Sequence, residues 1–252
     1  MHRPRKRFGQ NFLVDATTIE QLVNAINPRK SDHIIEIGPG LGALTQPLLT
    51  RVNALEAVEI DHDLIAHLKN FTTREHSLTI HATDVLEFDF SDTTYSRRVV
   101  GNLPYNISTP LIFHLLDHVN SIIDMHFMMQ KEVVERICAQ SGDRHFGRLS
   151  IMVQVKCSTT SLFDITPDNF NPPPKVTSAF MRLKPHAHPL VAKQLEPRFD
   201  TIVRQAFSQP RKTLANNLKK LFTSEQLESL GINPAIRPQN IQIPELISLA
   251  QA

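Results

Sequence analysis

Residues 33–42 have the sequence His-Ile-Ile-Glu-Ile-Gly-Pro-Gly-Leu-Gly, and this stretch decides the fold. The short apolar run His33–Ile37 ends directly in a turn with glycine at positions 38, 40 and 42, and helical periodicity resumes over residues 43–49. A strand, a glycine-rich turn and a helix in this order are typical of the first unit of an open α/β sheet. Because glycine has no side chain, backbone amides in such a turn approach a ligand closely, and the turn is a candidate binding site.

The same alternation of strand and helix patterns continues along the chain. Apolar segments that predict strands occupy residues 54–60, 78–82, 98–101 and 121–129. Helical periodicity covers residues 18–26, 64–68 and 111–116. Strands that alternate with helices form a parallel sheet, so we expect an α/β fold. Residues 149–157 and 176–183 are expected to form antiparallel strands that close the sheet.

The pattern changes after Lys184, where prolines and histidines at positions 185–189 interrupt any periodicity. Beyond this point only short helical patterns occur, over residues 199–207, 212–221 and 224–230 and after Pro244. The sequence therefore predicts an α/β domain over residues 1–184 and a small all-helical domain over residues 185–252.

The composition is that of an ordinary globular chain, with 41% hydrophobic and 21% charged residues among 252. Cys138 and Cys157 are not part of any metal-binding motif, so we expect no disulfide framework, no metal site and two thiols in a reducing compartment. No apolar stretch approaches the roughly 18 residues that suggest a membrane span. We expect a cytoplasmic protein.

Basic residues are concentrated near the two ends of the chain. The formal net charge is +2, yet residues 185–252 alone carry eight Lys and Arg against five Asp and Glu. One cluster consists of Arg3, Arg5, Lys6 and Arg7, and the other of Arg204, Arg211, Lys212, Lys219 and Lys220. Such clusters suit the phosphate backbone of a nucleic acid, although a solvated helix face and a basic tail give the same pattern.

Three acidic residues lie at the ends of successive predicted strands. Glu36 precedes the glycine turn, Glu59 lies twenty-one residues after Gly38, and Asp84 follows the third strand. Glu59 has the spacing of a carboxylate that accepts both hydroxyl groups of a ribose, and Asp84 can accept the amino group of an adenine. Each acid alone can also cap a helix or face water. Together they favour a nucleoside cofactor.

The spacing of the glycines distinguishes two classes of cofactor. A dinucleotide turn has the pattern Gly-x-Gly-x-x-Gly around a pyrophosphate, whereas glycine here recurs at every second position and residue 43 is alanine. Glu36 beside the turn would repel a pyrophosphate and suits a ligand with sulfonium and ammonium groups. We therefore favour S-adenosylmethionine, with a nicotinamide-dependent oxidoreductase as the alternative.

The segment Gly101–Asn106 follows the fourth predicted strand, at the same edge of the sheet as the acids. The side-chain carbonyl of Asn102 and the main-chain carbonyl of Leu103 can accept both protons of an exocyclic adenine amine. They would stabilise the positive charge that develops there as a methyl group arrives. Pro104 fixes φ in the turn, and Tyr105 can stack on the base. The alternative is a β-turn with a buried tyrosine.

A second aromatic candidate is Phe170, which precedes a loop with prolines at positions 172–174. Phe170 can cover the opposite face of the base. Its alternative role is that of a core phenylalanine that anchors the loop.

In order and spacing, these segments closely resemble the ribosomal RNA adenine dimethyltransferase family over almost the full chain. The shared elements are Phe8–Leu13, Glu36–Gly42, Glu59–Asp61, Asp84, Asn102–Tyr105 and Phe170–Ser178. The resemblance implies a Rossmann-like S-adenosylmethionine-dependent methyltransferase fold, mostly parallel with an antiparallel closing strand, and a small all-α C-terminal domain. It implies a cofactor site formed by Asn11, Leu13, Gly38, Glu59, Asp84 and Asn102. It also places Asn102, Tyr105 and Phe170 around the target adenine.

Within the family, the segment Phe207–Leu214 and its basic surroundings look like the bacterial small-subunit branch. This similarity implies dimethylation of the N6 amino groups of two adjacent adenosines in a hairpin loop near the 3′ end of small-subunit (16S) ribosomal RNA. It also implies a role in ribosome biogenesis. We expect a monomer whose basic N-terminal segment and basic C-terminal helices contact this RNA or a pre-small-subunit particle. The alternatives are a large-subunit ribosomal RNA adenine methyltransferase of the antibiotic-resistance type and an RNA-binding assembly factor with a secondary methyltransferase activity.

Overall fold

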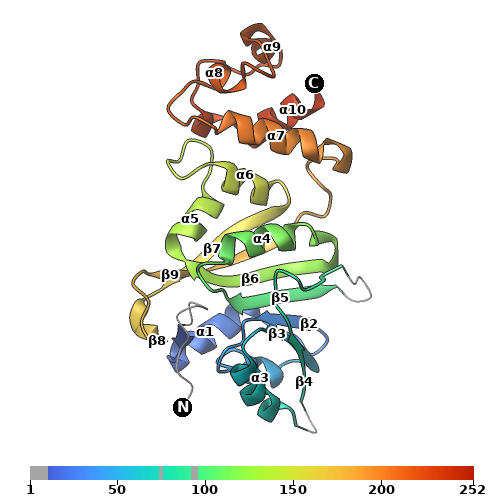
Figure 1. The fold of residues 1–252 in the computed structure, drawn as a ribbon, viewed down its shortest axis with the longest axis vertical. Coiled ribbons are helices and arrows are strands. Elements are labelled where there is room, and N and C mark those ends of the chain that lie inside the picture. The colour runs from blue at the N-terminus through green and yellow to red at the C-terminus, as the bar shows by residue number, and fades with distance from the viewer. Residues whose placement is uncertain (1–10, 74–75, 92–95) are drawn as a thin grey trace. The chain divides into compact units, whose positions relative to one another are not determined.

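The computed structural model describes residues 11–73, 76–91 and 96–252, and these residues form two compact units (Figure 1). Unit 1 comprises the chain up to Val134 together with Thr160–Pro185, and unit 2 comprises Glu135–Thr159 together with His186–Ala252. The boundary predicted after Lys184 lies beside an observed one, but residues 135–159 belong to unit 2 and not to the α/β unit. The physical reason is apolar burial, because Phe146, Ile151 and Val155 belong to the hydrophobic core of unit 2.

Unit 1 is built on a sheet of seven strands in the order β4-β3-β2-β5-β6-β9-β7 (Figure 1). The strands are β2 (His33–Ile37), β3 (Ala54–Glu59), β4 (Ser77–Ala82), β5 (Arg97–Asn102), β6 (Ile122–Gln130), β7 (Cys157–Ile165) and β9 (Ser178–Pro185). The pairs from β4 to β6 are parallel, and β9 pairs antiparallel with β6. This is the Rossmann-like order of the methyltransferase fold, so the expected fold class is confirmed.

Strand β2 lies in the interior of the sheet, between β3 and β5, because it is apolar on both faces. Ile34, Ile35 and Ile37 are at most 1% exposed. From β2 the chain builds outward to β3 and β4 and then returns to place β5 on the other side of β2. Ligands of open α/β sheets bind at such a reversal, at the carboxyl ends of the strands.

Four helices of unit 1 lie at predicted positions with small differences at their ends, whereas the helix over residues 131–138 was not predicted. These helices are α1 (Ala16–Ile26), α2 (Thr45–Leu49), α3 (His62–Leu68), α4 (Ser108–Leu116) and α5 (Lys131–Cys138), the last of which runs into unit 2. Short 3₁₀ turns occur at Lys69–Phe71, Val119–Ser121 and Pro167–Asn169. The side chain of Asp15 accepts the Thr18 N–H at 2.7 Å and so caps the start of α1, and Asn27 in a left-handed conformation ends it.

A separate two-stranded pair joins the N-terminal part of unit 1 to the proline loop. Strand β1 (Phe12–Leu13) pairs antiparallel with β8 (Phe170–Asn171), so Leu13 lies opposite Phe170. The pair is extended by the Val14 N–H, which donates to the Asn169 carbonyl at 2.9 Å, and by Thr18 Oγ1, which donates to Asn169 Oδ1 at 2.6 Å. These contacts fix the chain directly after Asn11.

The prediction of a strand over residues 149–157 is wrong, because residues 148–154 form helix α6 (Arg148–Gln154). Leu149, Ile151, Val153 and Val155 are apolar at every second position, which is the period of a strand. The intervening Ser150 is fully buried as well, where its hydroxyl donates to the Arg136 carbonyl and accepts from the Gly147 N–H. The closing strand is instead β7, whose polar sequence Cys-Ser-Thr-Thr-Ser-Leu-Phe-Asp-Ile suits a partly exposed position at the sheet edge.

Unit 2 is helical. Besides α6 it contains α7 (Glu196–Ala206), α8 (Leu214–Leu218), α9 (Ser224–Ser229), α10 (Ile243–Gln251) and 3₁₀ turns at Lys193–Leu195 and Pro238–Asn240. Its core includes Phe199, Ile202 and Val203 of α7, which are at most 1% exposed. The small all-α C-terminal domain of the predicted fold class is therefore present, enlarged by residues 135–159.

Two general findings concern the described residues as a whole. Within them, no helix combines the length and the apolar character that crossing a membrane requires. In the same ranges, no three His, Cys, Asp or Glu side chains are grouped so that they would hold a metal ion.

Candidate active site

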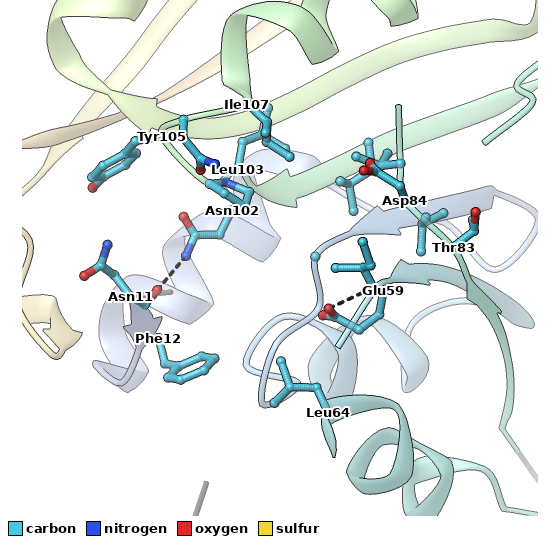
Figure 2. Close-up of a pocket in the computed structure, with 17 residues that line it drawn as sticks. Asn11, Phe12, Glu59, Leu64, Thr83, Asp84, Asn102, Leu103, Tyr105 and Ile107 are labelled. Atoms are coloured by element: carbon cyan, nitrogen blue, oxygen red, sulfur yellow. Dashed lines mark hydrogen bonds between the residues drawn. The ribbon is translucent and has the colours of Figure 1, made fainter. Parts of the chain in front are cut away.

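A cavity of about 250 Å³ lies in unit 1 where β2, β3 and β5 end (Figure 2). It is lined by Asn11, Phe12, Ile37, Gly38, Val58, Glu59, Ile60, Leu64, Thr83, Asp84, Val85, Asn102, Leu103, Pro104, Tyr105, Asn106 and Ile107. Seven of the nine predicted site residues are in this lining. The cavity therefore brings together segments that are far apart in the sequence, as the strand-end pattern predicts.

The glycine turn shapes one wall of the cavity. Gly38 and Gly40 have φ values of +61° and +59°, a left-handed conformation that glycine adopts without strain. A Cβ atom on Gly40 would lie 3.1 Å from the ring of Phe12, so glycine lets this ring pack against the turn. The turn thus gives Phe12 its place in the cavity wall.

Glu59 ends β3 with one carboxylate oxygen engaged and the other nearly free. Its Oε1 accepts the N–H groups of Ile60 and Asp61, both at 2.9 Å, and its Oε2 has only a long contact of 3.4 Å from the Gly40 N–H. Burial raises the pKa of this carboxyl, and the backbone donors oppose that shift. Oε2 is therefore the atom available to accept the hydroxyl groups of a ribose.

Asp84 lies two residues beyond β4, and its two carboxylate oxygens also differ in their hydrogen bonds. Its Oδ1 accepts the Leu86 N–H at 2.9 Å, which fixes the carboxylate, and no hydrogen bond to Oδ2 comes from any described residue. Thr83 and Val85, the neighbours of Asp84 in the sequence, also line the cavity, and Figure 2 shows Thr83 beside Asp84. The combination of a free acceptor and apolar surface suits a flat heteroaromatic ring that carries an amino group.

Glu36, which was expected beside the ligand, does not line the cavity. Successive residues of a strand point to opposite faces, so Ile37 faces the cavity and Glu36 faces the core. Glu36 is 2% exposed and accepts the Thr45 hydroxyl at 2.7 Å. Burial raises its pKa to about 7. The preference for a sulfonium cofactor that rested on Glu36 therefore has no support from its position.

The carboxamide of Asn102 is held in one orientation at the end of β5. Its Nδ2 donates to the main-chain carbonyl of Asn11 at 3.1 Å (Figure 2). The reverse orientation would place two carbonyl oxygens against each other, so the hydrogen bond determines which atom is available. The side-chain oxygen Oδ1 is left without a partner among the described residues, and it lies on the side of Tyr105 (Figure 2).

Leu103 provides a second acceptor next to Asn102. Its N–H donates to the Met128 carbonyl of β6 at 3.0 Å, which fixes the peptide against the sheet, and its side chain is 1% exposed. Its own carbonyl accepts no hydrogen bond from the described part of the chain. Asn102 Oδ1 and the Leu103 carbonyl oxygen are therefore two acceptors at the end of β5 without a hydrogen-bond partner among the described residues, and both residues line the cavity.

Tyr105 lies beside these acceptors, half-buried, with its hydroxyl 2.7 Å from Ser178 Oγ. Burial raises the pKa of Tyr105. The interpretation of this residue as a tyrosine enclosed in a β-turn does not fit, because the ring borders the cavity (Figure 2).

Two predicted site residues do not line the cavity. Leu13 and Phe170 lie opposite each other in the β1–β8 pair, are 6% and 4% exposed, and belong to the hydrophobic core of unit 1. For Phe170 the structure thus matches the alternative interpretation of a core phenylalanine that anchors the proline loop.

Several apolar members of the lining were not predicted from the sequence. Phe12 stands between two predicted site residues, Ile60 and Val85 each directly follow one, and Ile107 lies two residues after Tyr105. The signal that indicates them is this closeness in the sequence to a predicted site residue.

These groups fit S-adenosylmethionine. Glu59 Oε2, with its long contact to Gly40, matches a ribose, and Asp84 Oδ2, which accepts no hydrogen bond from a described residue, matches an adenine amine. Apolar side chains and the residues Asn102 and Leu103 line the same cavity. With a mostly parallel sheet closed by antiparallel β9, this cavity defines the class of the protein. It is an S-adenosylmethionine-dependent methyltransferase.

Comparison with known proteins identifies the family. Residues 1–252 match the family model described as ribosomal RNA adenine dimethylase. The chain is 50% identical to ribosomal RNA small subunit methyltransferase A of Legionella pneumophila, over 99% of this chain and 98% of that one. The chain therefore belongs to the ribosomal RNA adenine dimethylase family.

Solved structures agree with this assignment. A dimethyladenosine transferase from Plasmodium falciparum superposes with a TM-score of 0.82 at 27% identity, covering 94% of this chain and 95% of that one. The 23S rRNA methyltransferase ErmE superposes with a TM-score of 0.75 at 23% identity, covering 96% of this chain and 100% of that one, and shares the fold.

Proposed function

We propose that this protein dimethylates the N6 amino groups of two adjacent adenosines in a hairpin loop near the 3′ end of small-subunit ribosomal RNA, with S-adenosylmethionine as methyl donor and a role in ribosome biogenesis. The observation that carries the chemistry is the oriented carboxamide of Asn102, whose Nδ2 is bound to the Asn11 carbonyl and whose Oδ1 is free. The small-subunit substrate is supported by the name of a relative that is 50% identical to nearly the whole chain. ErmE acts on 23S rRNA and has the same fold, so the fold alone does not select the substrate.

The cofactor site is proposed to consist of Asn11, Leu13, Gly38, Glu59, Asp84 and Asn102. When bound, S-adenosylmethionine supplies an electrophilic methyl group on a sulfonium centre. Glu59 Oε2 accepts the ribose hydroxyls, and Asp84 Oδ2 accepts the adenine amine. Leu13 contributes to this site through its backbone atoms, because its side chain is buried in the core. No metal is required by this set of groups.

The target adenine is proposed to lie with its amine at Asn102 and Leu103. The amine is a weak nucleophile because its lone pair is delocalised into the ring. Two carbonyl acceptors draw both protons out of the ring plane, turn the nitrogen toward tetrahedral geometry and stabilise the charge that develops on it. Tyr105 stacks on the base and holds it, a contact of about 1–3 kcal/mol in other single-strand binders. Positioning and charge stabilisation therefore account for the rate.

Unit 2 is proposed to contact the RNA backbone through its basic residues. Arg204 is the exception in the predicted cluster, because it donates to Asp200 at 2.7 Å and Arg148 donates to the same carboxylate at 2.9 Å. Arg211, Lys212, Lys219 and Lys220 are exposed, and none forms an ion pair with any described acidic residue. The N-terminal cluster Arg3–Arg7 lies outside the described residues and is proposed as a second contact.

The loop that presents Arg211 and Lys212 is held by a single buried side chain. Asn217 is 3% exposed, and its Oδ1 accepts the Gln209 N–H at 2.9 Å and the Ser208 hydroxyl at 3.0 Å. Its Nδ2 donates to the carbonyls of Gln209, Thr213 and Lys212 at 3.0, 3.1 and 3.4 Å. A loop fixed in this way holds two cations ready for a phosphate backbone, which lowers the entropy lost on binding.

The remaining proposals concern the setting of the reaction. We propose that the protein acts in the cytoplasm, where ribosomal subunits assemble, as a monomer on the RNA or on a pre-small-subunit particle.

The test uses labelled S-adenosylmethionine with small-subunit particles, naked small-subunit RNA and large-subunit RNA from cells that lack the gene. We expect dimethyladenine at two adjacent positions of the small-subunit RNA and none in the large-subunit RNA. Mapping both RNAs in cells with and without the gene checks the same assignment in vivo. Methylation of the large-subunit RNA instead would contradict the proposal.

A further inference from the structure

We propose that Ser178 is a positioning residue for Tyr105, and that its hydroxyl matters more for the second methyl transfer than for the first. This inference rests on the proposed function, in which Tyr105 stacks on the target adenine. It assigns a role to the end of the Phe170–Ser178 segment, which the cofactor and target contacts described above leave without one.

The geometry at Ser178 is that of a fixed anchor. Its Oγ lies 2.7 Å from Tyr105 Oη, and the residue is 0% exposed. Among the described residues, neither hydroxyl has another hydrogen-bond partner. Ser178 begins β9 and pairs with Gln130 at the end of β6, so the sheet fixes its backbone. The hydrogen bond therefore ties the tip of the Tyr105 ring to the sheet of unit 1.

The two ends of the Phe170–Ser178 segment hold the two functional side chains of the Asn102–Tyr105 motif. At one end, Phe170 pairs with Leu13 and so holds β1, whose preceding residue orients the Asn102 carboxamide. At the other end, Ser178 binds the Tyr105 hydroxyl. Phe170 thus contributes to the site through β1, and Ser178 contributes through Tyr105.

Both hydroxyl groups of this pair are neutral at physiological pH. Burial raises the pKa of Tyr105, which keeps its hydroxyl protonated. With both groups neutral, either hydroxyl can donate to the other, and the ring stays fixed before any base arrives. Fixing the ring in advance removes part of the entropy lost when the base stacks.

The two methyl transfers differ in how much they depend on Tyr105. An unmodified adenine amine has two N–H groups, which engage both Asn102 Oδ1 and the Leu103 carbonyl. In the first transfer the nitrogen bonds to the methyl carbon as the carbon–sulfur bond breaks, S-adenosylhomocysteine leaves, and the nitrogen loses one proton to solvent. The amine then has a single N–H, so only one of the two acceptors can be engaged. Stacking on Tyr105 then accounts for a greater part of the positioning, and a loosely held ring slows the second transfer more than the first.

The experiment follows N6-methyladenine and dimethyladenine over time by mass spectrometry, with small subunits from cells lacking the gene as substrate. Ser178→Ala is expected to slow the first transfer about fivefold, the effect of losing one hydrogen bond between uncharged groups. The second transfer is expected to slow further, so that N6-methyladenine accumulates. Tyr105→Phe should give the same product ratio, and the double variant should be no slower than either single one.

The matched control is Ser121→Ala, which also removes a buried hydroxyl from unit 1. Ser121 is 3% exposed and donates to the Phe90 carbonyl at 2.6 Å, and it does not line the cavity. We expect this variant to keep the wild-type ratio of the two products even if its melting temperature falls. If Ser178→Ala fails to fold, Tyr105→Phe decides the question, because it removes the same hydrogen bond and leaves Ser178 in place.

Two results overturn the inference: wild-type rates in Ser178→Ala and Tyr105→Phe, or equal slowing of both transfers with additive effects in the double variant. Failure of the proposed function looks different. In that case the wild-type protein makes no N6-methylated adenine in small-subunit RNA, or Tyr105→Ala keeps the wild-type rate.

Discussion

Asn102 in unit 1 and Asn217 in unit 2 use the same carboxamide in opposite ways. The side chain of Asn217 is saturated, with two donors at its oxygen and three carbonyls at its nitrogen. Asn102 uses its nitrogen for one hydrogen bond and leaves its oxygen free at a cavity. A saturated carboxamide builds structure, whereas one that is oriented but left open at a cavity is prepared for chemistry. The two asparagines therefore predict opposite consequences of substitution.

The largest effect is expected for Asn102→Ala. Loss of the oriented acceptor should lower kcat at least about 100-fold, as removal of a preorganised charge-stabilising group does elsewhere. RNA binding and the melting temperature should change little, because only one hydrogen bond of the protein is lost. Methylation with labelled cofactor and a filter-binding assay with the RNA measure the two quantities. Full methylation activity in this variant would refute the proposed chemistry.

Asn217→Ala should show the reverse pattern. It removes the five hydrogen bonds that the buried carboxamide makes with the 208–213 loop, and should lower the free energy of unfolding by about 2–3 kcal/mol. The KM for RNA should rise, and kcat at saturating RNA should stay near the wild-type value. Asn216→Ala is the matched control, because Asn216 is exposed and bonds only to Thr213. Similar loss of stability in both variants would mean that saturation of the side chain is not what matters.

Glu36 extends the comparison to a buried group that is neither saturated nor at a cavity. Its pKa is raised from 4.5 to about 7, so its contribution to stability is present below pH 4.5 and is lost as the pH rises through about 7. Glu36→Gln has no such titration. The variant should therefore gain about 2 kcal/mol relative to the wild type between pH 5 and pH 8.

Chemical denaturation of both proteins across this pH range measures the difference. The buried His126, whose pKa is lowered to about 4, is present in both proteins and cancels. A difference that stays constant with pH would show that Glu36 does not titrate in this range.

The smallest effect is expected for Asn102→Asp, which tests whether the orientation of the Asn102 side chain matters for catalysis. The carboxylate offers two acceptors but cannot donate to the Asn11 carbonyl, so it is repelled by the atom that holds the amide in place. We expect kcat to fall about tenfold, which corresponds to about 1.4 kcal/mol. Wild-type kcat in this variant would mean that the hydrogen bond to Asn11 has no part in catalysis.

Prediction from the sequence was correct for those parts of unit 1 in which the pattern of apolar residues fits only one kind of buried position. The strand at His33–Ile37 was predicted with its observed bounds, because a run that is apolar on both faces suits only the centre of a parallel sheet. The period of residues 149–157 predicted a strand and was misleading, since a helix buried on several sides shows no clear face. A segment between two stretches of unit 1, such as residues 135–159, gave no compositional sign that it packs with unit 2.

For the site, strand ends predicted which polar residues meet, and packing decided which way they face. Glu59, Asp84 and Asn102 lie beyond or at strand ends and line the cavity, whereas Glu36 lies within a strand and points to the core. Phe170 was predicted to stack on the base and is buried, because pairing of two-residue strands far apart in the sequence leaves no periodic signal.

The pairing of β1 with β8 also has a consequence for the order in which the protein is made. Phe12 can pair with Asn171 only after about 160 further residues have been translated. This takes roughly ten to thirty seconds at bacterial rates of synthesis. Until then Asn11 is not held beside Asn102, and the Tyr105 ring has no anchor before Ser178 has emerged. A chain that ends before Phe170 therefore lacks both of these contacts. The arrangement of the site depends on residues from the two ends of unit 1.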